Sequence, residues 1–229
     1  MARKINQIVR MTCLLLILGT ATNGQVPVDS TYINTHYTLR LDFFKKMPDQ
    51  KKEIVFLGNS LTEGGKWQEL INKKNVINRG ISGDVTYGIL ARLDEVTKAK
   101  PAKIFLLCGI NDMKRGISNE LILDNFRRIV SAIKSASPKT TLYIQSLLPV
   151  YETVLPASYS QISNQKINDL NGKLRTLCRA QNVVYVDLHP AFADEQGSMK
   201  KELAIDGLHL RQASYILWAK RLKETGAFK

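Results

Sequence analysis

The chain has 229 residues, enough for one domain of ordinary size with a full hydrophobic core. Its 33 lysines and arginines against 20 acidic residues give a formal net charge of +13. The basic residues are scattered, without an aromatic–basic stripe or a DNA-binding motif, so we expect no nucleic-acid partner. Anionic glycans or anionic lipid surfaces remain open as partners.

Residues 1–24 have the layout of a secretory signal peptide. A basic start precedes a short apolar core at 11–18, which is too short to span a bilayer, and small residues follow near Gly24. We therefore predict an exported protein, periplasmic or secreted, with one domain over 25–229. An uncleaved anchor or a buried N-terminal helix is the alternative. We expect no integral membrane segment after removal of the signal, and the net charge falls by three to +10.

Two cysteines, Cys108 and Cys178, remain in the mature chain. Their spacing does not suggest zinc, and no cluster predicts another metal. Two buried thiols are the default interpretation, although export leaves one disulfide possible.

Short apolar runs alternate along the chain with longer segments of helical period. One helix is expected over 37–44. The predicted strands are 54–57, 76–77, 104–107, 142–144 and 183–186, and helical patterns fall at 89–93, 122–133, 162–177 and after 209. Continuous apolar strands that alternate with amphipathic helices favour a parallel sheet covered on both faces. The predicted fold is a three-layer α/β/α sandwich with about five parallel strands, similar to flavodoxin.

Three polar, glycine-bearing loops follow the first three predicted strands. In such a sheet, ligands collect beyond the carboxyl ends of the strands, so these loops are expected to meet at one rim. Ser60 follows the first strand and is a candidate nucleophile, although a serine there is most often a helix cap. The nucleophile elbow of the α/β-hydrolases is absent, because Thr62 stands where its second glycine would be.

A hydroxyl nucleophile needs a base, and the chain has three histidines. His36 precedes the first strand and has no acidic residue close in sequence. Asp206 and His209 lie one turn apart before the last helix, and the pair Asp187 and His189 is equally possible by spacing.

Asn111 and Gly83 are candidate donors to an oxyanion. The Asn111 amide could face a developing charge, and Gly83 would let a substrate approach its backbone N–H. Each also has a plain interpretation as a turn residue.

Taken together, the sequence segments around these residues resemble those of the SGNH hydrolases, also called the GDSL esterase/lipase family. The four blocks occur in order: Gly58-Asn59-Ser60-Leu61, Gly80-Ile81-Ser82-Gly83-Asp84, Gly109-Ile110-Asn111-Asp112 and Asp206-Gly207-Leu208-His209. The resemblance runs from about residue 53 to 218 and is closest to the compact branch. That branch includes the catalytic subunits of platelet-activating-factor acetylhydrolase, and exported bacterial carbohydrate acetylesterases look similar.

The resemblance implies Ser60 as nucleophile, His209 as base and then acid, and Asp206 as the residue that orients it. It also implies an oxyanion hole made of the N–H of Ser60, the N–H of Gly83 and the side chain of Asn111. Two departures are visible. Asn59 replaces the usual Asp, and Arg211 follows His209 where Asn-x-x-Gly-Tyr is common. Candidate substrate contacts are Asn59, Trp67, Asp84 and Arg211.

We therefore expect a serine esterase without metal or organic cofactor. Its substrate is a small-molecule or glycan ester, with acetyl as the expected acyl group and an O-acetylated sugar as the expected carrier. The loop 147–159 is expected to help shape the cleft. The alternatives are a lipid-directed acylhydrolase, such as a lysophospholipase or thioesterase-like enzyme, a flavin-binding protein and a glycan-binding protein with an idle triad. The sequence gives no oligomeric state.

Overall fold

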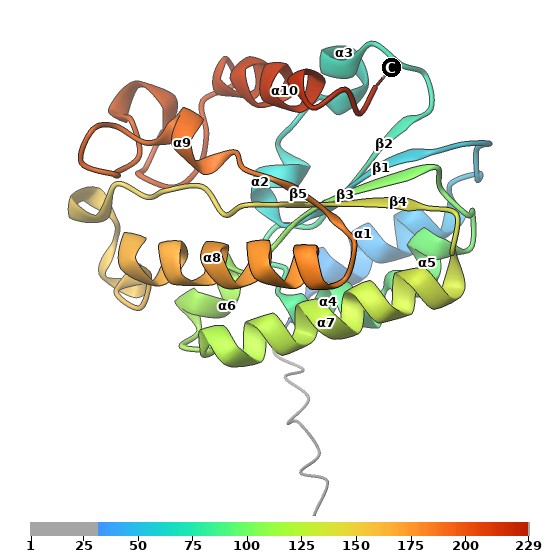
Figure 1. Cartoon of the computed structure of the whole chain (residues 1–229), viewed down its shortest axis with the longest axis horizontal. Helices are drawn as coiled ribbons and strands as arrows, with labels where there is room; N and C mark the ends of the chain where they lie inside the picture. Colours follow the sequence, from blue (N-terminus) through green and yellow to red (C-terminus); the bar gives the residue numbers. More distant parts are fainter. Residues whose placement is uncertain (1–31, 229) are drawn as a thin grey trace, which may run out of the picture.

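The computed structural model describes residues 32–228 (Figure 1). The predicted signal peptide, residues 1–24, and the start of the predicted domain lie outside the described residues. Among residues 32–228, no helix is long and apolar enough to cross a membrane.

Five strands form one parallel sheet in the order β2-β1-β3-β4-β5. The strands are β1 (Ile54–Gly58), β2 (Val76–Gly80), β3 (Lys103–Leu107), β4 (Thr141–Gln145) and β5 (Val184–Val186). Each lies over a predicted apolar run, so the α/β class and the five parallel strands are confirmed. Every residue of β1 is buried, as expected for a central strand covered on both faces.

Helices cover both faces of the sheet (Figure 1). The helix α3 (Trp67–Ile71) packs with α10 (Ser214–Glu224) on one face. The long helices α7 (Asn119–Ala136) and α8 (Asn164–Ala180) lie together on the other. The remaining α-helices are α1 (Thr35–Lys46), α2 (Ser60–Glu63), α4 (Thr86–Ala91), α5 (Leu93–Thr97), α6 (Ile110–Lys114) and α9 (His189–Phe192). Single 3-10 turns span Glu152–Val154, Ala157–Tyr159 and Lys201–Leu203.

Side-chain caps explain where the main helices begin. Asn34 accepts a hydrogen bond from the N–H of Tyr37 at the start of α1, and Ser118 and Ser163 cap α7 and α8 in the same way. The helical pattern at 89–93 is interrupted, however. Arg92 has a φ of −123° and separates α4 from α5, because its side chain turns inward to a buried partner.

Stacked aromatic rings fill the core between the sheet and the helices α3 and α10. Trp67 is 1% exposed and lies 4.1 Å from Phe56, centroid to centroid, with Trp218 at its edge. Trp67, which was expected to contact substrate, thus lies with its ring enclosed by the core. Cys108 and Cys178 are both buried and unpaired, so the default interpretation of two free thiols is confirmed.

We expect Phe105→Ala to lower the free energy of unfolding by about 3–5 kcal/mol. Phe105 is 0% exposed and stacks on Phe56 and Tyr143, so truncation leaves a cavity in the middle of the sheet. The control is Phe43→Ala, which removes a ring that is 51% exposed and should cost less than about 1 kcal/mol. Urea unfolding measures both; equal losses would contradict the central place of Phe105.

Candidate active site

Ser60 is the first residue of α2, directly beyond the end of β1. The side-chain oxygen of Asn59 accepts from the N–H of Leu61 at 3.1 Å and starts the helix there. Asn59, which was expected to contact substrate, is 0% exposed and holds this turn from within the protein. The backbone conformation that Asn59 fixes sets where the Ser60 hydroxyl points.

His209 comes to Ser60 from a segment 149 residues further along the chain. The distance from Ser60 Oγ to His209 Nε2 is 3.2 Å, and His209 Nδ1 lies 2.7 Å from Asp206 Oδ2. The other oxygen of Asp206 accepts from the N–H groups of Leu208 and His209. One tight turn therefore holds carboxylate and imidazole together, as the Asp206–His209 spacing suggested.

This arrangement selects one tautomer of His209. An ionised carboxylate only accepts hydrogen bonds, so Nδ1 carries the proton toward Asp206 and Nε2 is left as acceptor for the Ser60 hydroxyl. Burial acts to raise the pKa of Asp206, but the hydrogen bonds from the His209 ring and from two backbone N–H groups outweigh it and lower the pKa. Asp206 is thus an anion under ordinary conditions.

The alternative pair, Asp187 and His189, is not assembled. Asp187 Oδ2 instead bonds the guanidinium of Arg175 at 2.5 Å. His189 begins α9, and its Nε2 is buried without a hydrogen-bond partner among the described residues. The structure thus joins Ser60 to Asp206 and His209 and separates it from the other candidate pair.

Gly83 lies in the loop after β2 and Asn111 in the first turn of α6, and these two segments are tied to each other. The Asn111 amide donates to the carbonyl of Asp84 at 2.9 Å, which occupies one of its two N–H donors. Arg115 donates to the carbonyl of Gly83 at 3.1 Å. Gly83 has a φ of +82°, and a Cβ there would meet no atom within 4 Å. Glycine is therefore present for its backbone conformation, and the space above it is open.

Asp84, which was expected to contact substrate, is half of a buried ion pair. It is 1% exposed, and its carboxylate accepts from the guanidinium of Arg92 at 2.9 Å, with both side chains fully enclosed. Arg92 also donates to the carbonyl of Gly58 at the end of β1, at 3.1 Å. In the sequence, the feature that could have indicated a buried Arg92 is a charged residue inside an apolar helical pattern.

A second buried carboxylate, Asp112, fixes the start of α4. It accepts from the backbone N–H of Thr86 at 3.0 Å and from its hydroxyl at 2.5 Å, and Asn125 donates to that hydroxyl. Burial raises the pKa of Asp112 to about 6, although the hydrogen bonds from Thr86 act to lower it. Two buried carboxylates, Asp84 and Asp112, therefore hold the segment that follows Gly83 in place.

The remaining predicted residues lie at the periphery. Arg211 is exposed two positions after His209. The loop after β4 reaches the Asp206–His209 turn, because the N–H of Tyr151 donates to the carbonyl of Gly207 at 2.8 Å. Within residues 32–228, no group of three or more His, Cys, Asp or Glu side chains is placed to hold a metal ion.

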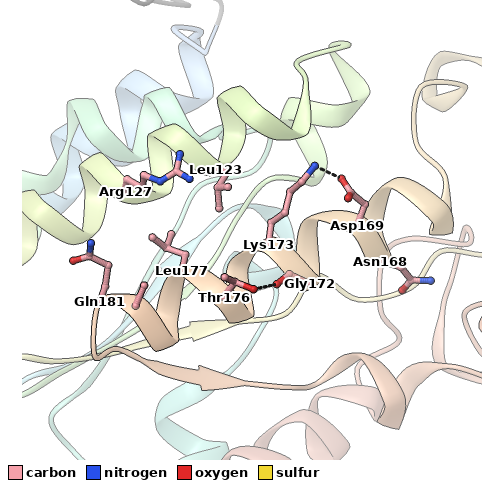
Figure 2. Close-up of a pocket in the computed structure, with 10 residues that line it drawn as sticks. Leu123, Arg127, Asn168, Asp169, Gly172, Lys173, Thr176, Leu177 and Gln181 are labelled. Carbon is pink, nitrogen blue, oxygen red and sulfur yellow. Dashed lines mark hydrogen bonds and ion pairs between the residues drawn. The ribbon is translucent and has the colours of Figure 1, made fainter.

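A groove of about 520 Å³ runs between α7 and α8, away from this cluster (Figure 2). Leu123 and Leu177 lie along it, and Lys173 at its rim bonds Asp169 at 2.7 Å. Its lining comes only from the two helices and the adjoining Gln181, so it is separate from Ser60 and His209.

Comparison with known proteins places the chain in a family. Residues 56–216 match the GDSL-like Lipase/Acylhydrolase family. The platelet-activating factor acetylhydrolase IB subunit alpha2 of Rattus norvegicus is 28% identical over 202 residues, which cover 86% of this chain and 83% of that protein. A Streptococcus pneumoniae structure described as a platelet activating factor has a TM-score of 0.76 and 31% identity, covering 83% of this chain and 92% of that one.

An acetyl-xylooligosaccharide esterase from Geobacillus is similar in fold, with a TM-score of 0.63, 18% identity, and coverage of 80% of this chain and 98% of its own. The family match takes in most of the chain and includes Ser60, Gly83, Asn111 and His209. The protein is thus a carboxylic ester hydrolase. It belongs to the GDSL-like lipase/acylhydrolase (SGNH) family, and the resemblance of its four motif blocks is confirmed.

We expect Arg92→Met to lower the free energy of unfolding by about 3–5 kcal/mol, because it leaves the Asp84 carboxylate buried without its partner. The matched control is Arg221→Met, which breaks an ion pair with Glu224 whose side chains are both more than 40% exposed. That loss should stay below about 1 kcal/mol. Denaturant unfolding of both variants decides, and similar small losses would contradict the role given to Arg92.

Asp112 should give the protein a distinct pH dependence. Its folded pKa of about 6 lies above the ordinary value of 3.8, so folding takes up a proton between these values. Its contribution to stability is therefore fullest below about pH 4 and is lost as the pH rises to about 6, by up to roughly 3 kcal/mol. We expect the difference in unfolding free energy between wild type and Asp112→Asn to shrink over this range; a constant difference would contradict it.

Proposed function

We propose that the protein is a serine esterase that removes short acyl groups, acetyl above all, from carbohydrate esters. The observation that carries the proposal is the continuous chain of hydrogen bonds from Ser60 through His209 to Asp206, with distances of 3.2 and 2.7 Å. Such a chain has the geometry needed to activate a hydroxyl nucleophile.

In the first half of the reaction, Ser60 Oγ attacks the ester carbonyl carbon and its proton passes to His209 Nε2. The carbonyl oxygen becomes an oxyanion, for which we assign the N–H of Ser60, the N–H of Gly83 and the second N–H of Asn111. The bond to the alcohol then breaks, and His209 gives its proton to the departing oxygen. Asp206 stabilises the imidazolium and holds its orientation throughout.

In the second half, a water takes the place of the alcohol. His209 removes a proton from the water, which attacks the acyl-enzyme carbon and forms a second oxyanion at the same donors. The bond to Ser60 Oγ breaks, the serine recovers its proton from His209, and a carboxylic acid leaves. Each group ends in its starting state, so no cofactor is needed for the sequence of steps.

The choice of acetyl rests on the relatives. The mammalian relative is an acetylhydrolase by name, and the Geobacillus structure is an acetyl-xylooligosaccharide esterase by name. Their shared acyl group supports the same preference here.

The choice of a carbohydrate rests on the polar and aromatic residues beside the cluster. Lys114 follows Asn111 by three residues, and its ammonium group lies 3.8 Å from the ring centroid of Tyr159. On the side of the Asp206–His209 turn, Lys201 lies 5.0 Å from the ring of Tyr151. Rings and ammonium groups of this kind suit a hydroxylated ligand, and an acidic sugar in particular.

A lipid ester is the second candidate. The relatives named for platelet-activating factor are more similar in sequence than the acetyl-xylooligosaccharide esterase, at 28% against 18% identity. A preference for lipid esters would keep the same chemistry at Ser60 and change only the carrier.

We expect Ser60→Ala and His209→Ala to lower turnover of p-nitrophenyl acetate by roughly four or more orders of magnitude, since each removes a group of the acyl-transfer step. Asn111→Ala should lower it by about two to three orders, the usual cost of one oxyanion donor. The control is Asn119→Ala, which changes a half-buried asparagine bonded to Asp169 and should leave turnover within about twofold of wild type. Normal turnover in Ser60→Ala would contradict the proposed nucleophile.

A panel of substrates tests separately the preferred acyl chain length and the preferred acetylated molecule, carbohydrate or phospholipid. We expect acetate to be hydrolysed faster than butyrate and octanoate as p-nitrophenyl esters, and O-acetylated xylo-oligosaccharides or uronic acids faster than an acetylated glycerophospholipid. Release of acetate is measured for each carrier. A preference for the phospholipid, or for octanoate, would favour the second candidate.

We also propose that the protein is exported after cleavage near residue 24, on the basis of the sequence pattern. Mass spectrometry of the N-terminus of the native protein tests this, and a retained Met1 would contradict cleavage.

A further inference from the structure

A cluster of polar contacts surrounds Glu63, the last residue of the helix that begins with Ser60. Glu63 Oε2 accepts from the backbone N–H of Ser82 at 2.5 Å and from its hydroxyl at 2.6 Å. The same oxygen lies 3.1 Å from Nε2 of His36, and Oε1 lies 3.3 Å from Nε of Arg40. The acidic partner of His36 lies 27 residues away along the chain, so it is not visible from the residues near His36 in sequence.

The position of Glu63 joins the two halves of the proposed oxyanion hole. It is three residues after Ser60 in α2, and the residue that it holds, Ser82, directly precedes Gly83. The N–H of Gly83 belongs to the peptide group that links Ser82 to Gly83. A carboxylate fixed to both donors of Ser82 therefore restricts the orientation of that peptide relative to α2.

Contacts to the backbone of residues 62–65 fix α2 against β2 independently of the Glu63 side chain. The Asn78 amide donates to the carbonyls of Thr62, Glu63 and Gly65, each at 3.0 Å. At Gly80, an added Cβ would lie 2.2 Å from the backbone nitrogen of Glu63, so the two backbones are in direct contact. Asn78, Gly80 and Ser82 alternate along the strand and its extension, and only the last is held by a side chain of α2.

We propose that Glu63 is a positioning residue for ester hydrolysis, which aligns the N–H of Gly83 with Ser60 by holding Ser82. The inference rests on the proposed function, because it concerns the oxyanion hole of that reaction. Burial acts to raise the pKa of Glu63, but the hydrogen bonds from Ser82 and His36 and the charge of Arg40 together lower it. Glu63 is thus an acceptor for all of its partners.

The proposal predicts an effect on turnover and not on substrate affinity. The oxyanion forms only after attack, so a displaced Gly83 N–H weakens the transition state more than the bound ester. For Glu63→Ala we expect kcat to fall by about 10- to 100-fold, less than the full loss of an oxyanion donor, with KM within about threefold of wild type. Glu63→Gln keeps an acceptor oxygen for Ser82 and should retain kcat within about threefold.

The matched control is His36→Ala. It removes another partner of the same carboxylate oxygen, on α1, and leaves the contacts to Ser82 in place. If Glu63 positions the Gly83 loop, His36→Ala keeps kcat within about twofold of wild type. A loss equal to that of Glu63→Ala would instead mean that Glu63 serves to attach α1, and would overturn the proposal.

The experiment measures kcat and KM for acetate esters in wild type, Glu63→Ala, Glu63→Gln, His36→Ala and Ser60→Ala, with amide hydrogen exchange over residues 80–86. Faster exchange there in Glu63→Ala, together with the selective loss of kcat, supports the proposal. Unchanged kcat in Glu63→Ala, no rescue by Glu63→Gln, or unchanged exchange overturns it. If Glu63→Ala does not fold, Glu63→Asp replaces it, because the shorter side chain withdraws the carboxylate from Ser82.

Failure of the proposed function gives a different pattern. Wild type and Ser60→Ala would then have the same background hydrolysis, whatever happens at Glu63. Hydrogen exchange would still report whether Glu63 holds the loop, so a null activity result does not hide the structural part of the inference.

Discussion

The enclosed guanidinium of Arg92 is the interaction on which the arrangement of the active edge depends. It joins the end of β1, through the carbonyl of Gly58, to Asp84 in the loop beyond β2. Ser60 follows the first of these points by two residues, and Gly83 precedes the second by one. A charge without access to water must keep its partners, because leaving either one unpaired is costly. The separation between Ser60, the proposed nucleophile, and the loop of Gly83 is consequently set inside the protein.

Around Arg92, the segments that follow β2 and β3 are held to one another by hydrogen bonds. Asn111 bonds the carbonyl of Asp84, Arg115 bonds the carbonyl of Gly83, and Asp112 holds Thr86 just beyond. The Asp206–His209 turn is attached separately, through Tyr151. Such fixed donors need little rearrangement when charge develops in a reaction, which is the physical basis of electrostatic catalysis.

The sequence predicts the frame well and the supporting contacts poorly. Apolar runs identify all five strands, because the central strands are buried on both faces and the outer strands β2 and β5 still carry apolar residues. Four short blocks identify the family. The burial of Trp67, Asn59 and Asp84 was not foreseen, because the sequence shows nearness to a motif and not the direction of a side chain. The pairing of His36 with Glu63 and the inward turn of Arg92 depend on tertiary contacts, which local patterns do not encode.

The separation of 149 positions between Ser60 and His209 bears on when, during folding, the molecule becomes able to act. Synthesis delivers the hydroxyl early and the imidazole at position 209 of 229, after every strand of the sheet. Contacts between residues so far apart form only after a large loss of chain entropy. A nascent or incompletely refolded chain thus holds the proposed nucleophile without its proposed base. We expect the onset of ester cleavage to mark arrival of the C-terminal segment rather than collapse of the sheet.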